Sequence, residues 1–254
     1  MTNILMTGHE GFIGSALWER LSTKHDLMGV DIKSGDDILS CELPHPDVVE
    51  MVIHLAGIGG VRESLADPQK YWNNNVEGTK RILNYYPNAR VLVAGSSSQY
   101  EPHLNPYAAS KNVIEYIPHP NCCFMRFHTV YGPIPRANMF FDKLLNNKLE
   151  YVTPHKRDFI HIEDCIKGVV TTMDKIDDGS PINLSTGKLT SFKEFVKIGC
   201  NILGFETEVV GTSDKPEGVF ARGGDTKLQH DLGFVAKINF KSGIKDALKF
   251  FEKN

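Results

Sequence analysis

The chain has 254 residues, of which 41% are hydrophobic and 23% charged, and its formal net charge is −3. This length can bury a large core in one or two interlocked domains, and the small negative charge favours neither nucleic acid nor an anionic membrane as a partner. Because no apolar run approaches the roughly 20 residues of a membrane span and the N-terminus is predicted as a strand instead of a signal peptide, we expect a soluble cytoplasmic protein.

The five cysteines do not predict a metal site or a disulfide framework. Their number is odd, and Cys41, Cys122, Cys123, Cys165 and Cys200 lack the paired spacing of zinc ligands. Cys122 and Cys123 lie in an apolar run, where packing in a buried strand is the expected role. A reactive thiol pair is the alternative.

A glycine-rich turn follows the apolar run Ile4–Met6 and runs from Gly8 to Gly14. Gly8 suits a turn with positive φ, Gly11 lets the backbone approach a pyrophosphate, and Gly14 permits close packing of a helix on the strand. The helix that begins at Phe12 and Ile13 would direct its free N–H groups at phosphate oxygens. This pattern predicts a dinucleotide site.

The next strand, Leu27–Val30, ends in Asp31, where a carboxylate can accept hydrogen bonds from an adenosine ribose. An acid at this position repels a 2′-phosphate, so the sequence favours NAD over NADP. Lys33, two residues later, is a cation that could attract a 2′-phosphate and so weakens this preference slightly.

A second motif predicts acid/base chemistry. Asn105 can cap a helix that has Pro106 in its first turn, which places Tyr107 and Lys111 one turn apart on one face. A neighbouring cation lowers the pKa of a phenol and makes tyrosinate available as a general base. The alternative is that Tyr107 and Lys111 lie on the surface of an ordinary helix. This alternative is weakened by Ser96–Ser98, which follows a buried strand, because an open α/β sheet binds its ligand at the carboxyl ends of its strands.

Strands and helices alternate along the chain, which predicts an α/β fold with a Rossmann-type, doubly wound parallel sheet and a smaller C-terminal lobe. A Pro-rich turn, Gly132–Pro135, marks the boundary between them. We predict that residues 1–132, completed by 158–184, form an NAD-binding domain. Residues 133–157 and 185–254 would form the substrate-binding lobe.

The chain resembles the NAD-dependent nucleotide-sugar epimerase/dehydratase family of extended short-chain dehydrogenases/reductases. The resemblance runs through nearly the whole chain and includes Gly8–Gly14, Val52–Gly57, Asn75–Thr79, Ser96–Tyr100, Tyr107–Lys111, Arg126–Pro133, Arg157–Asp164 and Arg222–Asp225. Among the members, the UDP-glucose and UDP-glucuronate 4-epimerases are the most similar.

This resemblance implies a role for each matching residue. Tyr107 would be the base, Lys111 would hold the nicotinamide ribose, and Ser96 would complete the proton path. Further cofactor contacts would come from Asp37, Ile38, Leu55, Ala56, Gly57 and Asn75. Arg157 and Arg222 would grip the nucleotide diphosphate through their planar forks, with Asp225 nearby. Pairing of Arg157 with Asp158 is the structural alternative.

The resemblance also narrows the reaction. Dehydratases of the family carry an Asp-Glu pair where this chain has Ser97 and Ser98, which cannot supply the second acid and base of an elimination. Epimerisation at C4 through a 4-keto sugar needs only the Tyr, the Ser and NAD. Two alternatives stay open: an NAD(P)H-dependent reductase of a 4-keto nucleotide sugar, and a non-catalytic NAD-binding sensor.

Two further expectations concern the substrate and the assembly. Thr129 and Arg136 resemble residues that, with the serines at 97 and 98, bind the carboxylate of UDP-glucuronate; a solvated Arg136 that contacts nothing is the alternative. The segments around residues 37–51 and 97–106 are shorter than is usual in the family. We therefore expect a nucleotide-diphosphate sugar as partner and a monomer or weak homodimer as the assembly.

Overall fold

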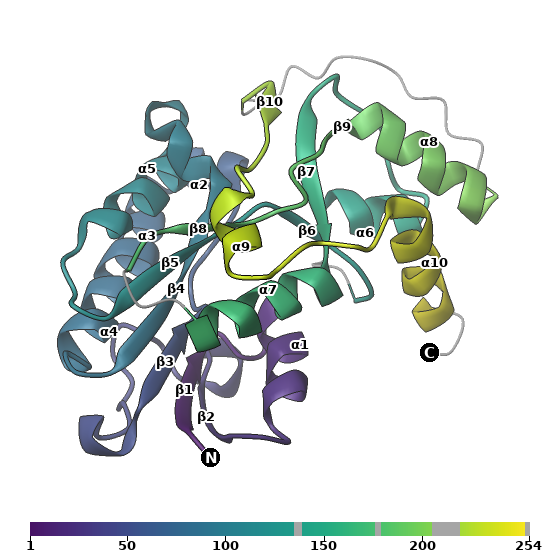
Figure 1. The fold of residues 1–254 in the computed structure, drawn as a ribbon. Helices are drawn as coiled ribbons and strands as arrows, with labels where there is room; N and C mark the ends of the chain where they lie inside the picture. The colour runs from purple at the N-terminus through teal and green to yellow at the C-terminus, as the bar shows by residue number, and fades with distance from the viewer. Residues whose placement is uncertain (135–138, 176–178, 205–218, 252–254) are drawn as a thin grey trace. The chain divides into compact units, whose positions relative to one another are not determined.

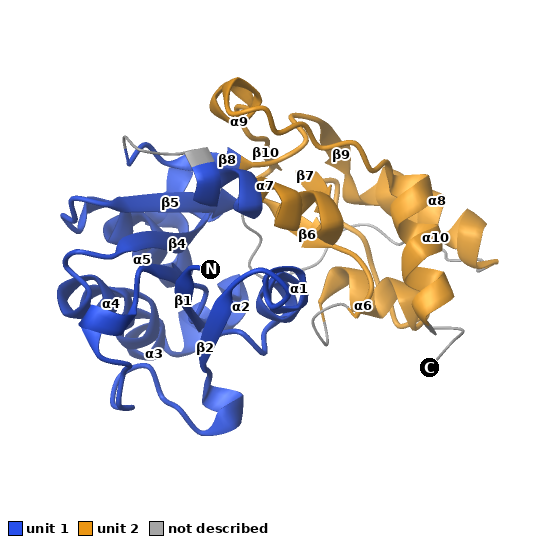
Figure 2. Ribbon diagram, turned by 60° about the horizontal axis from the view of Figure 1, so that its bottom comes forward, with its two compact units in different colours: residues 1–127, 169–183 blue, residues 128–168, 184–254 orange. Residues whose placement is uncertain are grey.

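The protein forms two compact units in a computed structural model that describes residues 1–134, 139–175, 179–204 and 219–251 (Figure 1). The first unit comprises residues 1–127 and 169–183, and the second comprises residues 128–168 and 184–254 (Figure 2). The domains predicted from the sequence differ from these units because they assign residues 128–132, 158–168 and 184 to the first part.

The first unit is built on a six-stranded sheet in the order β2-β1-β3-β4-β5-β8. Its strands are β1 (Asn3–Thr7), β2 (Asp26–Val30), β3 (Met51–His54), β4 (Arg90–Ser96), β5 (Cys122–Phe127) and β8 (Ile182–Leu184). Strands β1 to β5 pair in parallel. The chain passes from β1 to β2 and returns to β3 on the other side of β1, and the carboxyl ends at this reversal are where such a sheet binds its ligand. The predicted α/β class is confirmed.

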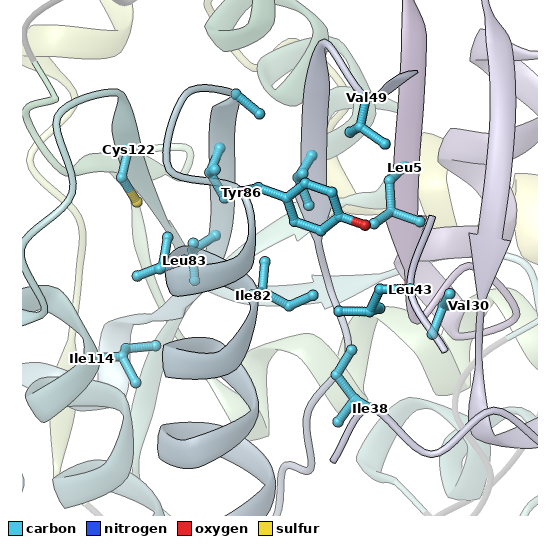
Figure 3. Close-up of a cluster of buried hydrophobic side chains, with 14 of the residues drawn as sticks. Leu5, Val30, Ile38, Leu43, Val49, Ile82, Leu83, Tyr86, Ile114 and Cys122 are labelled. Carbon is cyan, nitrogen blue, oxygen red and sulfur yellow. The ribbon is translucent and has the colours of Figure 1, made fainter. Parts of the chain in front are cut away.

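Helices cover both faces of this sheet. They are α1 (Phe12–Leu21), α2 (Val61–Ala66), α3 (Pro68–Trp72), α4 (Gly78–Tyr85), α5 (Pro106–Val113) and α7 (Ile162–Lys175), of which α7 continues from the second unit into the first. Figure 3 shows Leu83 and Tyr86, from α4 and its C-terminal cap, in a buried cluster with Leu5 of β1. Ile4 and Met6, the neighbours of Leu5 in β1, point to the opposite face of the sheet and are also buried. Burial on both faces explains the continuous apolar runs.

Helices α3 and α4 follow each other directly, with the π-helical turn Asn73–Glu77 between them. A π-helical turn frequently marks a functional site because its extra residue changes the direction in which side chains point. Asn75 and Val76 of this turn are buried.

The second unit packs short strands and helices around aromatic rings. Its elements are β6 (Thr129–Tyr131), α6 (Phe140–Leu145), β7 (Lys156–His161), β9 (Leu189–Ser191), α8 (Phe192–Leu203), β10 (Ala221–Arg222), α9 (Lys227–Asp231) and α10 (Phe240–Phe251). Strand β7 pairs in parallel with β6 and β10 and antiparallel with β9. The ring of Phe195 lies 4.6 Å from that of Phe159 and 5.2 Å from that of Tyr131, centroid to centroid. The sequence does not predict these strands. Strands β6, β9 and β10 have at most three residues, which is too short for a pattern, and β7 starts with three charged residues.

Within the described ranges, no helix is both long and apolar enough to cross a membrane. The same part of the chain holds no group of three or more His, Cys, Asp or Glu side chains arranged to bind a metal ion. The cysteines are free thiols, four of them buried and Cys41 half-buried.

Candidate active site

The glycine turn after β1 is packed too tightly for side chains. Gly8 has φ of 72°, and a Cβ atom on it would lie 2.6 Å from the backbone nitrogen of Ala56. A Cβ atom on Gly14 would lie only 2.1 Å from the carbonyl oxygen of Gly8. Gly11 caps α1 without a side-chain hydrogen bond, so the first N–H groups of the helix, starting at Phe12 and Ile13, keep the donors that bind a phosphate. This cradle fits a dinucleotide pyrophosphate.

Asp31 follows β2 at the carboxyl edge of the sheet and is 6% exposed. Its two carboxylate oxygens accept hydrogen bonds from the backbone N–H groups of Glu10 and Lys33, each at 2.9 Å. A carboxylate oxygen can accept a second bond, so Asp31 is both fixed in place and still able to bind ribose hydroxyls.

The predicted adenine contacts differ between the two neighbouring residues. Asp37 is half-buried and accepts a hydrogen bond from the backbone of Leu39 at 2.9 Å. Ile38 instead packs its side chain into the core against Gly78. Its carbonyl oxygen accepts a bond from Arg81 at 2.6 Å. Ile38 therefore serves the core with its side chain.

Hydrogen bonds from His54 and Thr7 fix the start of the loop after β3. The ring of His54 joins Thr7 at 2.7 Å to Thr79 at 3.1 Å, and the backbone N–H of Ala56 donates to the hydroxyl of Thr7 at 3.2 Å. Burial, together with the charge of Lys111, lowers the pKa of His54 to about 3. A neutral His54 thus fixes the start of the segment Leu55–Gly57.

Asn75 connects this loop to α5. Its amide group accepts from the N–H of Ile58 at 2.9 Å and donates to the carbonyl of Ile58 at 3.0 Å. The same amide nitrogen donates to the hydroxyl of Ser110 at 2.9 Å. A Cβ atom on Gly57 would lie 2.9 Å from the Asn75 side-chain oxygen and 3.6 Å from Nζ of Lys111. The loop after β3, the π-helical turn and α5 therefore meet at one place.

Helix α5 begins as the sequence predicts. The side chain of Asn105 accepts from the N–H of Ala108 at 2.9 Å, and Pro106 occupies the first turn. Lys111 is 7% exposed and donates to the carbonyl of Ala94 at 2.7 Å. Burial lowers the pKa of Lys111 to about 8.

Tyr107 lies one turn before Lys111 and is half-buried. The ring of Tyr71 meets it edge to face, with centroids 6.2 Å apart. The Tyr71 hydroxyl donates to the carbonyl of Gly59 at 3.2 Å. Tyr71 therefore contacts both the predicted base and the loop after β3, a role that the sequence did not reveal because it depends on packing between separate helices.

The serine run lies at the end of β4. Ser96, Ser97 and Ser98 are 5–7% exposed, and the Ser96 hydroxyl accepts from the N–H of Ser98 at 3.1 Å. Asn112 of α5 donates to the carbonyl of Gln99 at 3.1 Å. Together with the bond between Lys111 and Ala94, this contact holds the serine run against the helix that carries Tyr107.

A further network, which the sequence analysis missed, braces the same elements. Arg126 of β5 binds the carboxylate of Glu115 through Nε at 2.9 and 3.2 Å, and also donates to the hydroxyl of Tyr100 at 3.0 Å. That hydroxyl donates to the side-chain oxygen of Asn183 at 3.0 Å. The end of the serine run is thereby tied to β5 and β8.

In the second unit, Arg157 of β7 and Arg222 of β10 are direct partners in the strand register. Residues opposite each other on neighbouring strands share one face, so two guanidinium groups start from adjacent points. Asp158 is fully buried and accepts bonds from Thr186 and Gly187 at 2.6–2.8 Å. Its carboxylate therefore holds that loop, which disfavours the structural pairing with Arg157.

The other predicted substrate residues of this unit are Asp225, Thr129 and Arg136. Asp225 is exposed and accepts from the N–H of Lys227 at 2.9 Å. Thr129 is half-buried in β6, paired with Phe159 of β7. Arg136 lies outside the described residues.

A model of the NAD dependent epimerase/dehydratase family matches residues 4–185. The chain belongs to this family. NAD is the cofactor that this membership assigns, and the glycine cradle and Asp31 fit it. The UDP-glucose 4-epimerase of Dictyostelium discoideum is 28% identical over 76% of this chain and 79% of that protein.

Solved structures share the family's fold across the whole chain. MoeE5, determined in complex with UDP-glucuronic acid and NAD, is 27% identical with a TM-score of 0.86 and 99% of each chain covered. TunA, an NAD-dependent NDP-hexosamine 5,6-dehydratase, has the same TM-score at 24% identity, covering 99% of this chain and 98% of its own, which shows the fold alone. Since one fold carries several reactions, the reaction must be argued from the residues of this chain.

Proposed function

We propose that the protein is an NAD-dependent epimerase that inverts C4 of a nucleotide-diphosphate sugar, with a UDP-hexose or UDP-hexuronate as substrate. The observation that carries this proposal is the placement of Tyr107 and Lys111 on α5, against the loop after β3 and the carboxyl end of β4. Similarity to a UDP-glucose 4-epimerase and to a protein that binds UDP-glucuronic acid with NAD supports it.

In this proposal Tyr107 takes the proton of the C4 hydroxyl and returns it to the 4-keto sugar after the sugar has turned over. Lys111, buried beside Gly57, lowers the pKa of the phenol when its ammonium is charged and holds the nicotinamide ribose. Ser96 completes the proton path. When bound, NAD would supply the redox chemistry, namely reversible hydride exchange with C4 of the sugar.

The cofactor would be held by residues that the structure already fixes. Gly8, Gly11, Phe12, Ile13 and Gly14 would bind the pyrophosphate, and Asp31 the adenosine ribose. Asp37 and Ile38 would contact adenine. Leu55, Ala56 and Gly57 would lie under the diphosphate and ribose of the cofactor, and the side chain of Asn75 would tie this loop to the site. The bidentate contact of Asn75 with Ile58 supports this role because it fixes the path of the loop.

The residues that the family resemblance assigns to the substrate belong to both units. The register pair Arg157 and Arg222 supports diphosphate binding, because the two arginines stand opposite each other on adjacent strands and a guanidinium group can donate paired hydrogen bonds to phosphate oxygens. Asp225 would lie at the nucleotide. For a hexuronate, Thr129, Arg136, Ser97 and Ser98 would bind the sugar carboxylate.

Dehydration is disfavoured because the positions after Ser96 hold buried serines in place of acids. A 4-keto sugar reductase would exchange NADPH, which Asp31 disfavours, and a non-catalytic sensor would not need the pair Tyr107 and Lys111. A cytoplasmic location and a monomeric or weakly dimeric state are part of the same proposal.

The test is a panel of UDP-, GDP- and dTDP-linked hexoses and hexuronates incubated with purified protein and followed by NMR for inversion at C4. We expect inversion of a UDP-sugar with no net change in the redox state of NAD, and none with Tyr107→Phe. Turnover that consumes NADPH would establish the reductase. Binding of NAD without turnover of any sugar in the panel would establish the sensor.

A further inference from the structure

Glu10 joins the glycine turn after β1 to the loop that follows Asp31. Its backbone N–H donates to one carboxylate oxygen of Asp31 at 2.9 Å, and its carbonyl accepts from the ammonium of Lys33 at 2.6 Å. The hydroxyl of Ser34 donates to the side-chain carboxylate of Glu10. The Glu10 carboxylate therefore spans the two segments that flank Asp31.

The two acids differ in exposure. Asp31 is 6% exposed and both its oxygens hold backbone N–H groups, whereas the Glu10 side chain is 39% exposed. If Asp31 binds the hydroxyls of the adenosine ribose, a phosphate on the 2′ oxygen of that ribose would lie near the two segments that hold Asp31. The bond from Ser34 holds the partly exposed Glu10 carboxylate at these segments.

Two basic side chains, Lys33 and His9, lie close to Glu10. Lys33 directs its ammonium at the backbone carbonyl of Glu10 instead of its carboxylate. The Nε2 atom of His9 lies 3.8 Å from the Glu10 carboxylate, and the ring is fixed by Trp18, 4.8 Å away between ring centroids.

We propose that Glu10 is a second specificity-determining acid, which acts with Asp31 to exclude a 2′-phosphate and makes the protein selective for NAD over NADP. The proposal rests on the cofactor part of the proposed function and is independent of the sugar. Lys33, the residue that favours NADP on sequence grounds, instead helps to hold the turn that carries Glu10.

The test is calorimetric titration of cofactor-free protein with NAD and with NADP at about pH 8. The variant is Glu10→Gln, which keeps the shape of the side chain and an acceptor for Ser34 but removes the charge. Glu19→Gln, on the exposed part of α1, is the matched control for loss of one negative charge.

We expect Glu10→Gln to strengthen NADP binding about fivefold and to change NAD binding by less than about twofold, as for a partly exposed charge pair. The difference between wild type and Glu10→Gln should shrink from about 0.01 M to about 1 M salt, since salt screens exposed charges. Glu19→Gln should keep the wild-type ratio of NAD to NADP affinity.

If Glu10→Gln leaves the ratio of NAD to NADP affinity unchanged, Glu10 has no role in selectivity. A change in this ratio that is equal at low and high salt also overturns the proposal, because a salt-independent effect would come from a change in structure and not from the lost charge. The sugar reaction is not part of this readout. A protein that fails as a 4-epimerase can still show the effect, and an active epimerase with an unchanged ratio refutes the role of Glu10 alone.

Discussion

The buried ammonium of Lys111 should make the stability of the cofactor-free protein depend on pH. Burial lowers its pKa from 10.5 to about 8, and the residue is 7% exposed. Between these two pH values the unfolded chain binds the proton that the folded protein has released, so the free energy of unfolding rises with pH. A shift of this size corresponds to about 3 kcal/mol. Near neutral pH, the buried ammonium lowers the free energy of unfolding by this amount, and the effect is lost by pH 10.5 because the folded protein then holds Lys111 in its neutral form.

The perturbation is Lys111→Met, which has a similar length and no charge. It also removes the donor to the Ala94 carbonyl, at a cost of about 1–3 kcal/mol that does not depend on pH. The free energy of unfolding of wild type minus that of Lys111→Met should therefore rise by about 3 kcal/mol from pH 7 to pH 10.5.

The assay is urea unfolding of cofactor-free protein, followed by tryptophan fluorescence at several pH values. Lys24→Met removes an exposed ammonium and serves as the control, with a difference from wild type that stays nearly constant. A constant difference for Lys111→Met as well would refute the argument that Lys111 is destabilised by burial.

Four further outcomes are expected. Tyr107→Phe should lower turnover by about a hundred- to ten-thousandfold while NAD affinity in titration stays near wild type; substantial residual turnover would exclude Tyr107 as the base. Arg222→Leu should raise KM for the UDP-sugar at least about tenfold, as loss of a charge-assisted phosphate contact does, and an unchanged KM would remove this arginine from the substrate site. Arg136→Leu should impair turnover of UDP-glucuronate more than that of UDP-glucose, and equal losses on both would count against a carboxylate contact. Sedimentation should show a monomer or weak dimer, because α5 spans only about 12 Å at 1.5 Å per residue; a stable dimer packed on α5 and α4 would contradict this.

The sequence predicts those features that depend on neighbours along the chain. The turn at Gly8, the strand that ends before Asp31, and the helix that starts at Asn105 follow from local rules on positive φ, strand length and capping. The resemblance to the family supported the prediction of a Rossmann-type parallel sheet. The order of the six strands confirms this type of sheet.

Contacts between distant segments could not be predicted in this way. The register that pairs Arg157 with Arg222, and the bond between Asn75 and Ser110, are set by strand order and helix packing. The burial of the Ile38 side chain against Gly78 is likewise a contact between distant segments, and the predicted contact of Ile38 with adenine stays a prediction. The assigned catalytic and binding roles themselves stay predictions.

The central claim is that the C4 hydrogen of a UDP-sugar leaves and returns within one active site that contains Tyr107. The most direct measurement uses a UDP-sugar carrying deuterium at C4, incubated with the purified protein in ordinary water and analysed by NMR. We predict a C4-inverted product that keeps deuterium at C4 and that forms about a hundred- to ten-thousandfold more slowly with Tyr107→Phe. Inversion with loss of the deuterium to water, or recovery of the sugar without inversion, would contradict it.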